Sequence, residues 1–284
     1  MMLLAYPNRD SDCTLAGGAW SVTLPLNNLK TRTFTEFART TDAAAASTKF
    51  TFVFSRVRKI QAQALANHNF SVQAQYRISW FRDVAMTDLA YQSAITDVFP
   101  MIYTEETADW DEGNFWDLRI TEEDRAAFRQ TMIHVAPRRY AGIRAGLVEI
   151  FDTANADGYL QAGRLFIADG WTPVFGMGLG AGIQYESRDE NAQAYSGARY
   201  FRSKPGPRVA RFNMPSLTIS EGMVNALDFQ RQLGTSGECL FMYEQKDTIY
   251  KQRRSFIGVP RALSPIEQPY KLEMSNAFEI EESL

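Results

Sequence analysis

The chain has 284 residues, with 33 acidic and 30 basic side chains and a formal net charge of −3. A length in this range accommodates one large or two ordinary domains. The slightly acidic balance gives no attraction to nucleic acid, and no apolar run reaches the about 18 residues that a membrane-spanning helix needs. We therefore expect a folded protein with no nucleic-acid partner and no membrane insertion.

The two cysteines, Cys13 and Cys239, lie far apart in the sequence. They favour free thiols in a protein assembled in the cytoplasm over a disulfide framework. The opening residues, MMLLAYPNRD, have a short apolar run with no basic region before it, so no secretory signal is expected.

The first part of the chain is typical of short antiparallel strands. Residues 20–24 alternate and end at Pro25, and residues 50–54 are rich in β-formers. The clearest strand is predicted over residues 72–80, where Val72 to Trp80 place every second, apolar side chain on one face.

Residues 83–131 are predicted to be an insertion with loops. It is rich in acidic residues between Glu105 and Asp124 and carries three aromatic residues, Trp110, Phe115 and Trp116. These aromatics are candidates for stacking on a sugar or for anchoring a subunit contact, since aromatic side chains are favoured at interfaces. Paired carboxylates also serve glycosidases, but the sequence does not place two of them at a catalytic separation.

Residues 148–173 predict two strands joined by a tight polar turn. Asp152, Asn155, Asp157 and Gly158 have the short side chains and the permissive backbone of turn residues. The same oxygens suit calcium, but the EF-hand spacing fails, because the twelfth position counted from Thr153 is an arginine. We therefore expect a structural turn rather than a metal site.

The pattern of residues changes after Pro173, and this change predicts two domains, at 1–173 and 174–284. Glycines alternate over residues 176–182, and no helix is predicted after them, which argues against a phosphate-binding loop. One short helix is predicted over residues 221–232, ending before Gly234. An exposed antiparallel strand is predicted over residues 272–281.

A basic segment in the second part is predicted to form a subunit interface. Its members are Arg199, Arg202, Lys204, Arg208 and Arg211. Interleaved aromatic residues would also suit a nucleic-acid groove. The prolines at 205 and 207 break the segment into a loop and the chain is acidic, so contact with an acidic protein neighbour is favoured.

Catalytic function is not expected. The only histidines are His68 and His134, and no G-x-S-x-G motif precedes a helix. A hydrolytic triad needs an oriented base beside a nucleophile, and a His/Cys metal site needs closely spaced ligand pairs. We predict no catalytic residues, no metal and no cofactor.

Four strings in the first part of the chain occur in a recognisable order. They are SVTLPLNN at 21–28, RTTD at 39–42, ALANHNFS at 64–71, and D-x-x-N-x-D-G-Y…G-R-L-F…W-x-P from Asp152 to Pro173. Together they resemble structural proteins of the tail tip of long-tailed bacteriophages with a flexible tail. The resemblance implies an all-β fold: a discoidin-like (galactose-binding-like) jelly-roll sandwich, followed by a smaller β-rich domain with one short helix.

The same resemblance implies a distal-tail or baseplate component of the virion. Such a protein forms a ring, here expected to contain three or six copies, that joins the tail tube to the hub and to the receptor-binding fibres. The alternative is a carbohydrate-binding module that adheres to a host glycan. A hydrolase is a third, less favoured interpretation.

Overall fold

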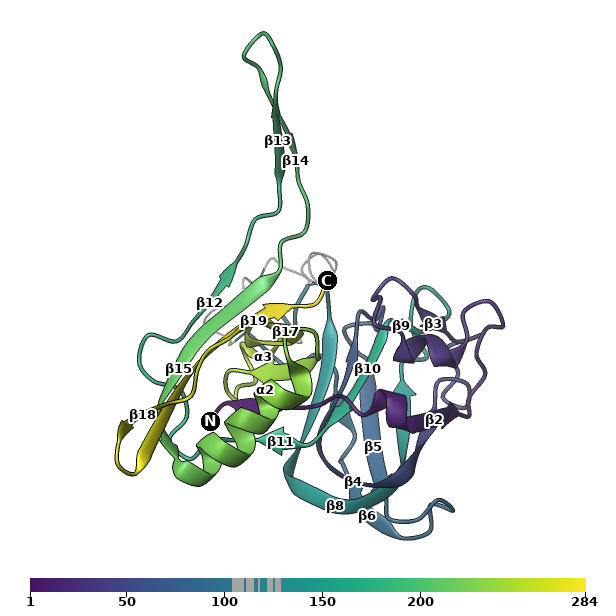
Figure 1. Ribbon diagram of the computed structural model, residues 1–284. Helices are drawn as coiled ribbons and strands as arrows, with labels where there is room; N and C mark the ends of the chain where they lie inside the picture. Colours follow the sequence, from purple (N-terminus) through teal and green to yellow (C-terminus); the bar gives the residue numbers. More distant parts are fainter. Residues whose placement is uncertain (104–109, 111–114, 117, 122–124, 126–128) are drawn as a thin grey trace. The chain divides into compact units, whose positions relative to one another are not determined.

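This computed structural model describes the chain except residues 104–109, 111–114, 117, 122–124 and 126–128 (Figure 1). Its contacts define two compact units. Unit 1 comprises Met1–Pro7, Trp171–Tyr243 and Arg254–Leu284, and unit 2 comprises Asn8–Gly170 and Glu244–Arg253. The main division lies close to the predicted boundary at 173. The first seven residues belong with the second part of the chain, and the segment 244–253 belongs with the first.

Unit 2 is built from strands with two short 3₁₀ helices. Its elements are η1 (Asp10–Asp12), β2 (Cys13–Ala16), η2 (Leu26–Lys30), β3 (Ala38–Arg39), β4 (Phe50–Ala66), β5 (Gln75–Phe81), β6 (Leu89–Gln92), β7 (Thr96–Asp97), β8 (Thr131–Phe151), β9 (Gln161–Ala162) and β10 (Arg164–Ala168). Most of these strands join one seven-stranded sheet in the order β10-β4-β8-β5-β6, with β2 beside β4 and β7 beside β5. Strands β3 and β9 form a separate pair.

The long strands β4 and β8 give unit 2 its layered form. They pair along both ends, and the register shifts between Val53 and Ala62. Strand β2 pairs with the first half of β4, and β10 pairs with the second half. Bulges let a strand bend and pass from one layer of a sandwich to the other. Large apolar side chains fill the interior, among them Phe50, Phe52 and Trp80.

The predicted elements of this part have mixed outcomes. The strand predicted over residues 72–80 is confirmed as β5. The strand predicted over residues 20–24 is wrong: only Trp20 forms an isolated bridge, with Thr40, and a 3₁₀ helix follows Pro25. Within the range predicted as an insertion, β6 and β7 pair with β5, so that part of the range belongs to the sheet.

Unit 1 contains an eight-stranded sheet that is covered on one face by a helix. Its elements are β1 (Leu3–Ala5), β11 (Gly170–Trp171), β12 (Gly182–Tyr185), β13 (Glu190–Gln193), β14 (Arg199–Arg202), β15 (Arg208–Thr218), the π-helical turn η3 (Glu221–Ala226), α2 (Leu227–Leu233), β16 (Cys239–Met242), β17 (Ser255–Leu263), β18 (Glu267–Tyr270) and β19 (Glu273–Glu282). The short helix α3 (Lys251–Arg254) lies almost wholly in the segment 244–253 of unit 2. Strand order in the sheet is β11-β1-β16-β17-β19-β15-β12, and β18 pairs with β19.

Alternating side chains explain how this sheet packs. On β19, Met274, Phe278 and Ile280 point into the core while the glutamates between them do not. The helix predicted over residues 221–232 is confirmed as η3 and α2, which bury Phe229 and Leu233 against the same core. The strand predicted over residues 272–281 is also confirmed, as β19.

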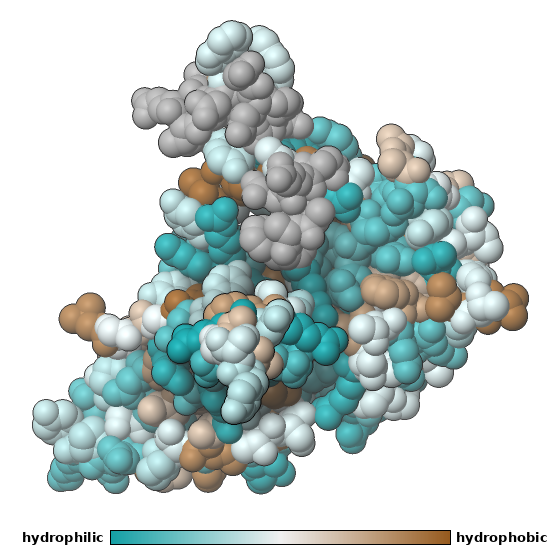
Figure 2. All heavy atoms as spheres, turned by 90° about the horizontal axis from the view of Figure 1, so that it is seen from above, coloured by the Kyte–Doolittle hydropathy of each residue, from teal (hydrophilic) through white to brown (hydrophobic). Residues whose placement is uncertain are grey.

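Strands dominate both units, so the predicted all-β class is confirmed. Among the described residues, no helix is long and apolar enough to cross a membrane. On the face shown in Figure 2, apolar side chains lie at scattered places among polar ones.

Candidate functional site

Strands β13 and β14 form a hairpin, here called the arm, that stands away from the sheet of unit 1 (Figure 1). Among the strands of the described residues, these two pair only with each other, from Glu190 opposite Arg202 to Gln193 opposite Arg199. Every residue of both strands is exposed. A two-stranded hairpin with no covered face is at best marginally stable by itself in water. Packing against another surface would therefore stabilise the arm.

The apolar side chains of the arm have no core to pack against. Tyr195, at the tip, is fully exposed, and Tyr200 and Phe201 on β14 are 65% and 69% exposed. Neighbouring strand positions point to opposite faces, so Tyr200 and Phe201 give each face of the arm one aromatic ring. Aromatic side chains supply much of the buried area at protein interfaces.

The tip of the arm is closed by local backbone bonds. The N–H of Ala194 donates to the carbonyl of Ala198 at 2.8 Å, and the N–H of Gly197 donates to the carbonyl of Ala194 at 2.9 Å. Gly197 has a φ of 87°, a conformation that costs glycine little. Sequence reasoning missed this hairpin. Its local signal is the Tyr-Ser-Gly turn between two four-residue runs, the second of which, residues 199–202, carries two aromatic side chains.

The basic residues predicted as an interface separate into two groups. Arg199 and Arg202 lie on the exposed strand β14, and Lys204 follows them and pairs with Glu190. Arg208 and Arg211 lie instead on β15 in the sheet. Arg208 is paired with Glu282, and Arg211 with Glu279 at 2.9 Å. The interface remains a prediction, and Arg199 and Arg202 are the members that the fold leaves on the arm.

The aromatic residues predicted in the acidic segment lie in unit 2. Trp110 is 82% exposed and Trp116 is 90% exposed. Phe115 is half-buried and packs edge-on against Trp116, with 5.3 Å between ring centroids. All four residues between Trp110 and Phe115 lie outside the described part of the chain. Both indole rings are therefore available to a sugar or to a neighbouring protein.

The predicted turn is held by the side chain of Asp152. Its carboxylate accepts the N–H of Ser71 at 2.8 Å and the amide Nδ2 of Asn155 at 2.9 Å. Gly158 has a φ of 71° and allows the chain to reverse. Asp157 accepts a bond from Asn69 at 2.7 Å. In the described ranges, no group of three or more His, Cys, Asp or Glu side chains is placed to hold a metal ion.

A buried polar cluster in unit 2 surrounds His134. Its two ring nitrogens lie 3.3 Å from the hydroxyl of Tyr76 and 3.0 Å from that of Tyr91. Burial, with a smaller contribution from the charge of Lys251, lowers the pKa of His134 to about 4. The Nζ of Lys251 donates to the carbonyl of Ile133 at 2.7 Å, and burial lowers its pKa to about 8. With both ring nitrogens occupied by tyrosines, the geometry of His134 is that of a structural group.

No protein-family model and no curated protein sequence matches this chain. Several solved structures match it at low identity. One is the family 32 carbohydrate-binding module of Clostridium perfringens NanJ in complex with galactose, at 12% identity, covering 59% of this chain and 99% of that one, with a TM-score of 0.38. Another is a family 32 module from a family 31 glycoside hydrolase of Clostridium perfringens, at 10% identity, covering 56% and 96%, with a TM-score of 0.36.

These two neighbours are named as carbohydrate-binding modules, and neither is named as a phage protein. At these identities and TM-scores the likeness carries no argument about what this chain binds.

Proposed function

We propose that this chain is a non-catalytic structural protein that assembles with neighbouring subunits through its arm. The observation that carries the proposal is the arm itself: a hairpin whose eight strand residues are all exposed and whose aromatic side chains Tyr195, Tyr200 and Phe201 lack a core. A two-stranded hairpin with no covered face is at best marginally stable alone, so rings exposed on both of its faces favour a partner that covers them. Burial of these rings against a partner would stabilise both the hairpin and the complex.

We further propose that the assembly is a ring in the distal tail or baseplate of a long-tailed bacteriophage. The resemblance of the four strings in the sequence supports this placement. A closed ring of identical subunits needs two unlike surfaces that meet head to tail. The arm supplies one of them, and an acidic surface of the next copy is the favoured partner for Arg199 and Arg202. The proposed ring has three or six copies, in the virion, between the tail tube and the hub and fibres.

The test compares the mass in solution of the natural chain with that of two variants. In one, residues 190–203 are replaced by a short Gly-Ser turn; in the other, Tyr200 and Phe201 are changed to alanine. Light scattering is expected to find a defined oligomer for the natural chain and monomers for both variants. Tyr270→Ala is the matched control, because Tyr270 is an equally exposed aromatic residue of the same unit outside the arm.

Circular dichroism and thermal unfolding would first establish that the variants are folded. An oligomer that survives removal of the arm would reject the arm as the assembly element. If the natural chain is itself a monomer, the same comparison is made by mixing it with purified tail-tube and hub proteins, and arm-independent binding would then count against the proposal.

A second function is favoured by a separate observation, the exposure of Trp110 and Trp116 in unit 2. Indole rings that face solvent can stack on sugar rings, so this surface is a candidate for binding a host glycan. A glycan array with the natural chain and with Trp110→Ala/Trp116→Ala tests it. Sugar binding that is lost in the variant while the oligomer persists would establish adhesion as a function distinct from assembly.

A further inference from the structure

The arm joins the sheet of unit 1 through a short irregular region, here called the root, which comprises residues 186–189 and 203–207. Backbone and side-chain hydrogen bonds join its two segments. The N–H of Glu186 donates to the carbonyl of Pro207 at 3.0 Å, and the N–H of Lys204 donates to the Asp189 carboxylate at 3.0 Å. The β13–β14 pairing does not continue through this region. The root is therefore the place where the direction of the arm is set.

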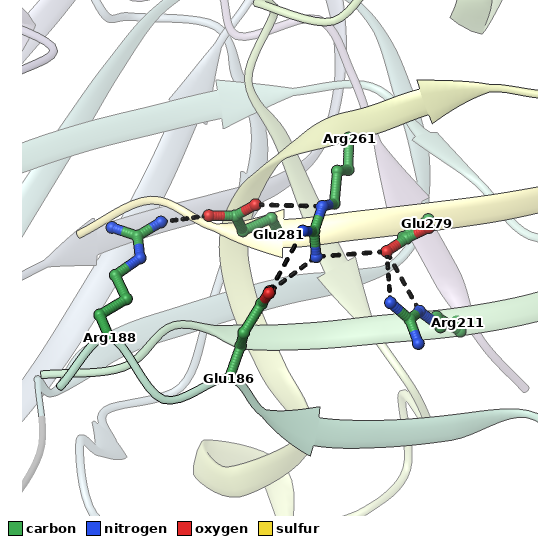
Figure 3. Close-up of polar contacts among 6 residues, drawn as sticks. All are labelled: Glu186, Arg188, Arg211, Arg261, Glu279 and Glu281. Carbon is green, nitrogen blue, oxygen red and sulfur yellow. Dashed lines mark hydrogen bonds and ion pairs between the residues drawn. The ribbon is translucent and has the colours of Figure 1, made fainter. Parts of the chain in front are cut away.

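Six charged side chains form a ladder from the root across one face of the sheet (Figure 3). They are Glu186 and Arg188 of the root, Arg211 of β15, Arg261 of β17, and Glu279 and Glu281 of β19. In this arrangement positive and negative groups alternate in space, so each charge has a partner of opposite sign.

Arg261 lies at the centre of this ladder. Its guanidinium meets the carboxylate of Glu186 in two bonds, of 2.6 and 3.2 Å. It also lies 3.5 Å from Glu279 and 3.8 Å from Glu281. A planar guanidinium that meets a carboxylate through two bonds fixes orientation as well as distance. Glu186 is thereby held over β17 rather than left free to rotate with the arm.

The second contact of the root with the sheet is made by Arg188, which pairs with Glu281. Glu281 is also near Arg261, and Glu279 is shared between Arg261 and Arg211. The segment of the root that leaves the sheet is therefore bound to it at two residues. Glu186 pairs with Arg261 of β17, and Arg188 pairs with Glu281 of β19. Two points of attachment fix the direction of this segment, whereas a single one would let it rotate.

We propose that this ladder aims the arm: it sets the direction in which the hairpin leaves unit 1 and so presents the aromatic rings to a partner. This inference rests on the proposed function in one respect: that the arm binds a partner subunit. Most ladder side chains are partly open to water, where ion pairs are weakened by salt. The aim of the arm should therefore depend on ionic strength.

The test measures the distance between two spin labels by pulsed electron resonance on the full chain. One label is placed at Ser196→Cys at the tip of the arm and the other at Gln232→Cys on α2, both exposed positions. Cys13 and Cys239 are buried, and burial raises the pKa of both thiols, so they react slowly with the label. A narrow distance distribution is expected at low salt, and about a twofold broader one at about 1 M NaCl, where screening is strong.

The ladder variant is Glu186→Gln/Arg188→Gln, which removes both ties and leaves the net charge unchanged. It is expected to show the broad distribution at low salt and no further broadening with added salt. The matched control is Arg82→Gln/Asp88→Asn, which removes an exposed ion pair of unit 2 and also leaves the net charge unchanged. The control is expected to keep the narrow distribution.

A ladder variant with the mean distance and width of the natural chain would overturn the inference. The distance measurement needs no partner, so its outcome is separate from that of the assembly test. If the ladder fixes the direction of the arm but the oligomer forms without the arm, the inference about the ladder holds and the proposed function is rejected. An arm that is essential for assembly but unaffected by loss of the ladder would do the reverse.

Discussion

Arg208 and Glu282 form a buried ion pair where the chain returns from the arm to the sheet. The Arg208 Nε donates to the Glu282 carboxylate at 2.8 Å, and the backbone N–H of Arg208 donates to the same carboxylate at 3.1 Å. Their side chains are only 8% and 11% exposed. Arg208 also lies over the ring of Phe256, 5.1 Å from its centroid. This pair secures the returning strand, as the ladder ties the departing one.

Removing one member of this pair is expected to destabilise unit 1. Arg208→Ala leaves the Glu282 carboxylate without its buried counter-charge, which costs on the order of 3–5 kcal/mol in the free energy of unfolding. The measurement is urea unfolding followed by circular dichroism. Arg208→Met/Glu282→Leu should lose much less, because neither charge remains unpaired. Equal losses for both variants would contradict the charge argument.

Arg211→Ala is expected to behave differently, although Arg211 lies on the same strand. Its side chain is more than half exposed, and its pair with Glu279 lies in the solvent-facing ladder. Exposed pairs contribute at most about 1 kcal/mol, so the unfolding midpoint should move little. A loss as large as that of Arg208→Ala would show that the ladder stabilises the sheet itself rather than only positioning the arm.

Gly206 in the root is expected not to tolerate a side chain. A Cβ at this position would lie 2.1 Å from the backbone carbonyl oxygen of Glu186, and backbone cannot move aside as a flexible side chain can. Gly206→Ala should therefore shift the root and change the tip distance in the spin-label measurement, with little effect on unfolding of the rest of unit 1. Gly182→Ala on β12 is the comparison, since a Cβ there meets no neighbouring atom and the backbone is not in the left-handed region. The tip-to-helix distance should be insensitive to it.

Unfolding should depend on pH through the two histidines. Burial lowers the pKa of His68 to about 3 and that of His134 to about 4, below the ordinary 6.5. Below pH 6.5 the imidazoles of the unfolded chain bind protons, whereas those of the folded chain stay neutral. The stability that is present above pH 6.5 is therefore lost as the pH falls toward 4. His134 faces the hydroxyls of Tyr76 and Tyr91 and the ammonium of Lys251, and none of these supplies a negative charge to balance an imidazolium.

The check is urea unfolding of the natural chain and of His134→Gln at several pH values. Between pH 6 and pH 4.5 the free energy of unfolding should fall more steeply for the natural chain than for His134→Gln. The difference in slope is expected to reach at most about 1.4 kcal/mol per pH unit, the value for one proton. Comparison of the two chains cancels the contribution of the carboxylates, which both contain. Parallel curves would show that His134 takes no part in the acid response.

Replacement of the exposed tryptophans should leave stability almost unchanged. Trp110→Ala and Trp116→Ala remove rings that are mostly in water, and surface changes of this kind usually fall within about 0.5 kcal/mol. Thermal unfolding of each variant measures this directly. A marked loss of stability would mean that the rings pack within the fold and would remove the basis for the glycan hypothesis.

The local sequence pattern was enough to predict a strand where apolar side chains recur with a strict period. The alternation of Val72 to Trp80 predicted β5, and that of residues 272–281 predicted β19, because one face of each strand must be apolar to cover a core. It failed at residues 20–24, where the alternation is equally good but no regular strand forms. Trp20 makes an isolated bridge with Thr40, and the backbone groups of Ser21 and Leu24 bond to the backbone of Arg39. Regular pairing is a tertiary event, and alternation alone does not supply it.

The candidate site shows the same division between what is local and what is not. The sequence alone identified the basic residues 199–211, the turn at Asp152 and the all-β class, since these follow from residue types and short spacings. Only the tertiary structure decided that Arg199 and Arg202 stand on an exposed arm while Arg208 and Arg211 are paired with Glu282 and Glu279. The partners of those two arginines lie about seventy residues further along the chain, brought near by the β15–β19 pairing. The physical reason is that the energetic value of a charge depends on its burial and its neighbours, and neither is written in the residues beside it.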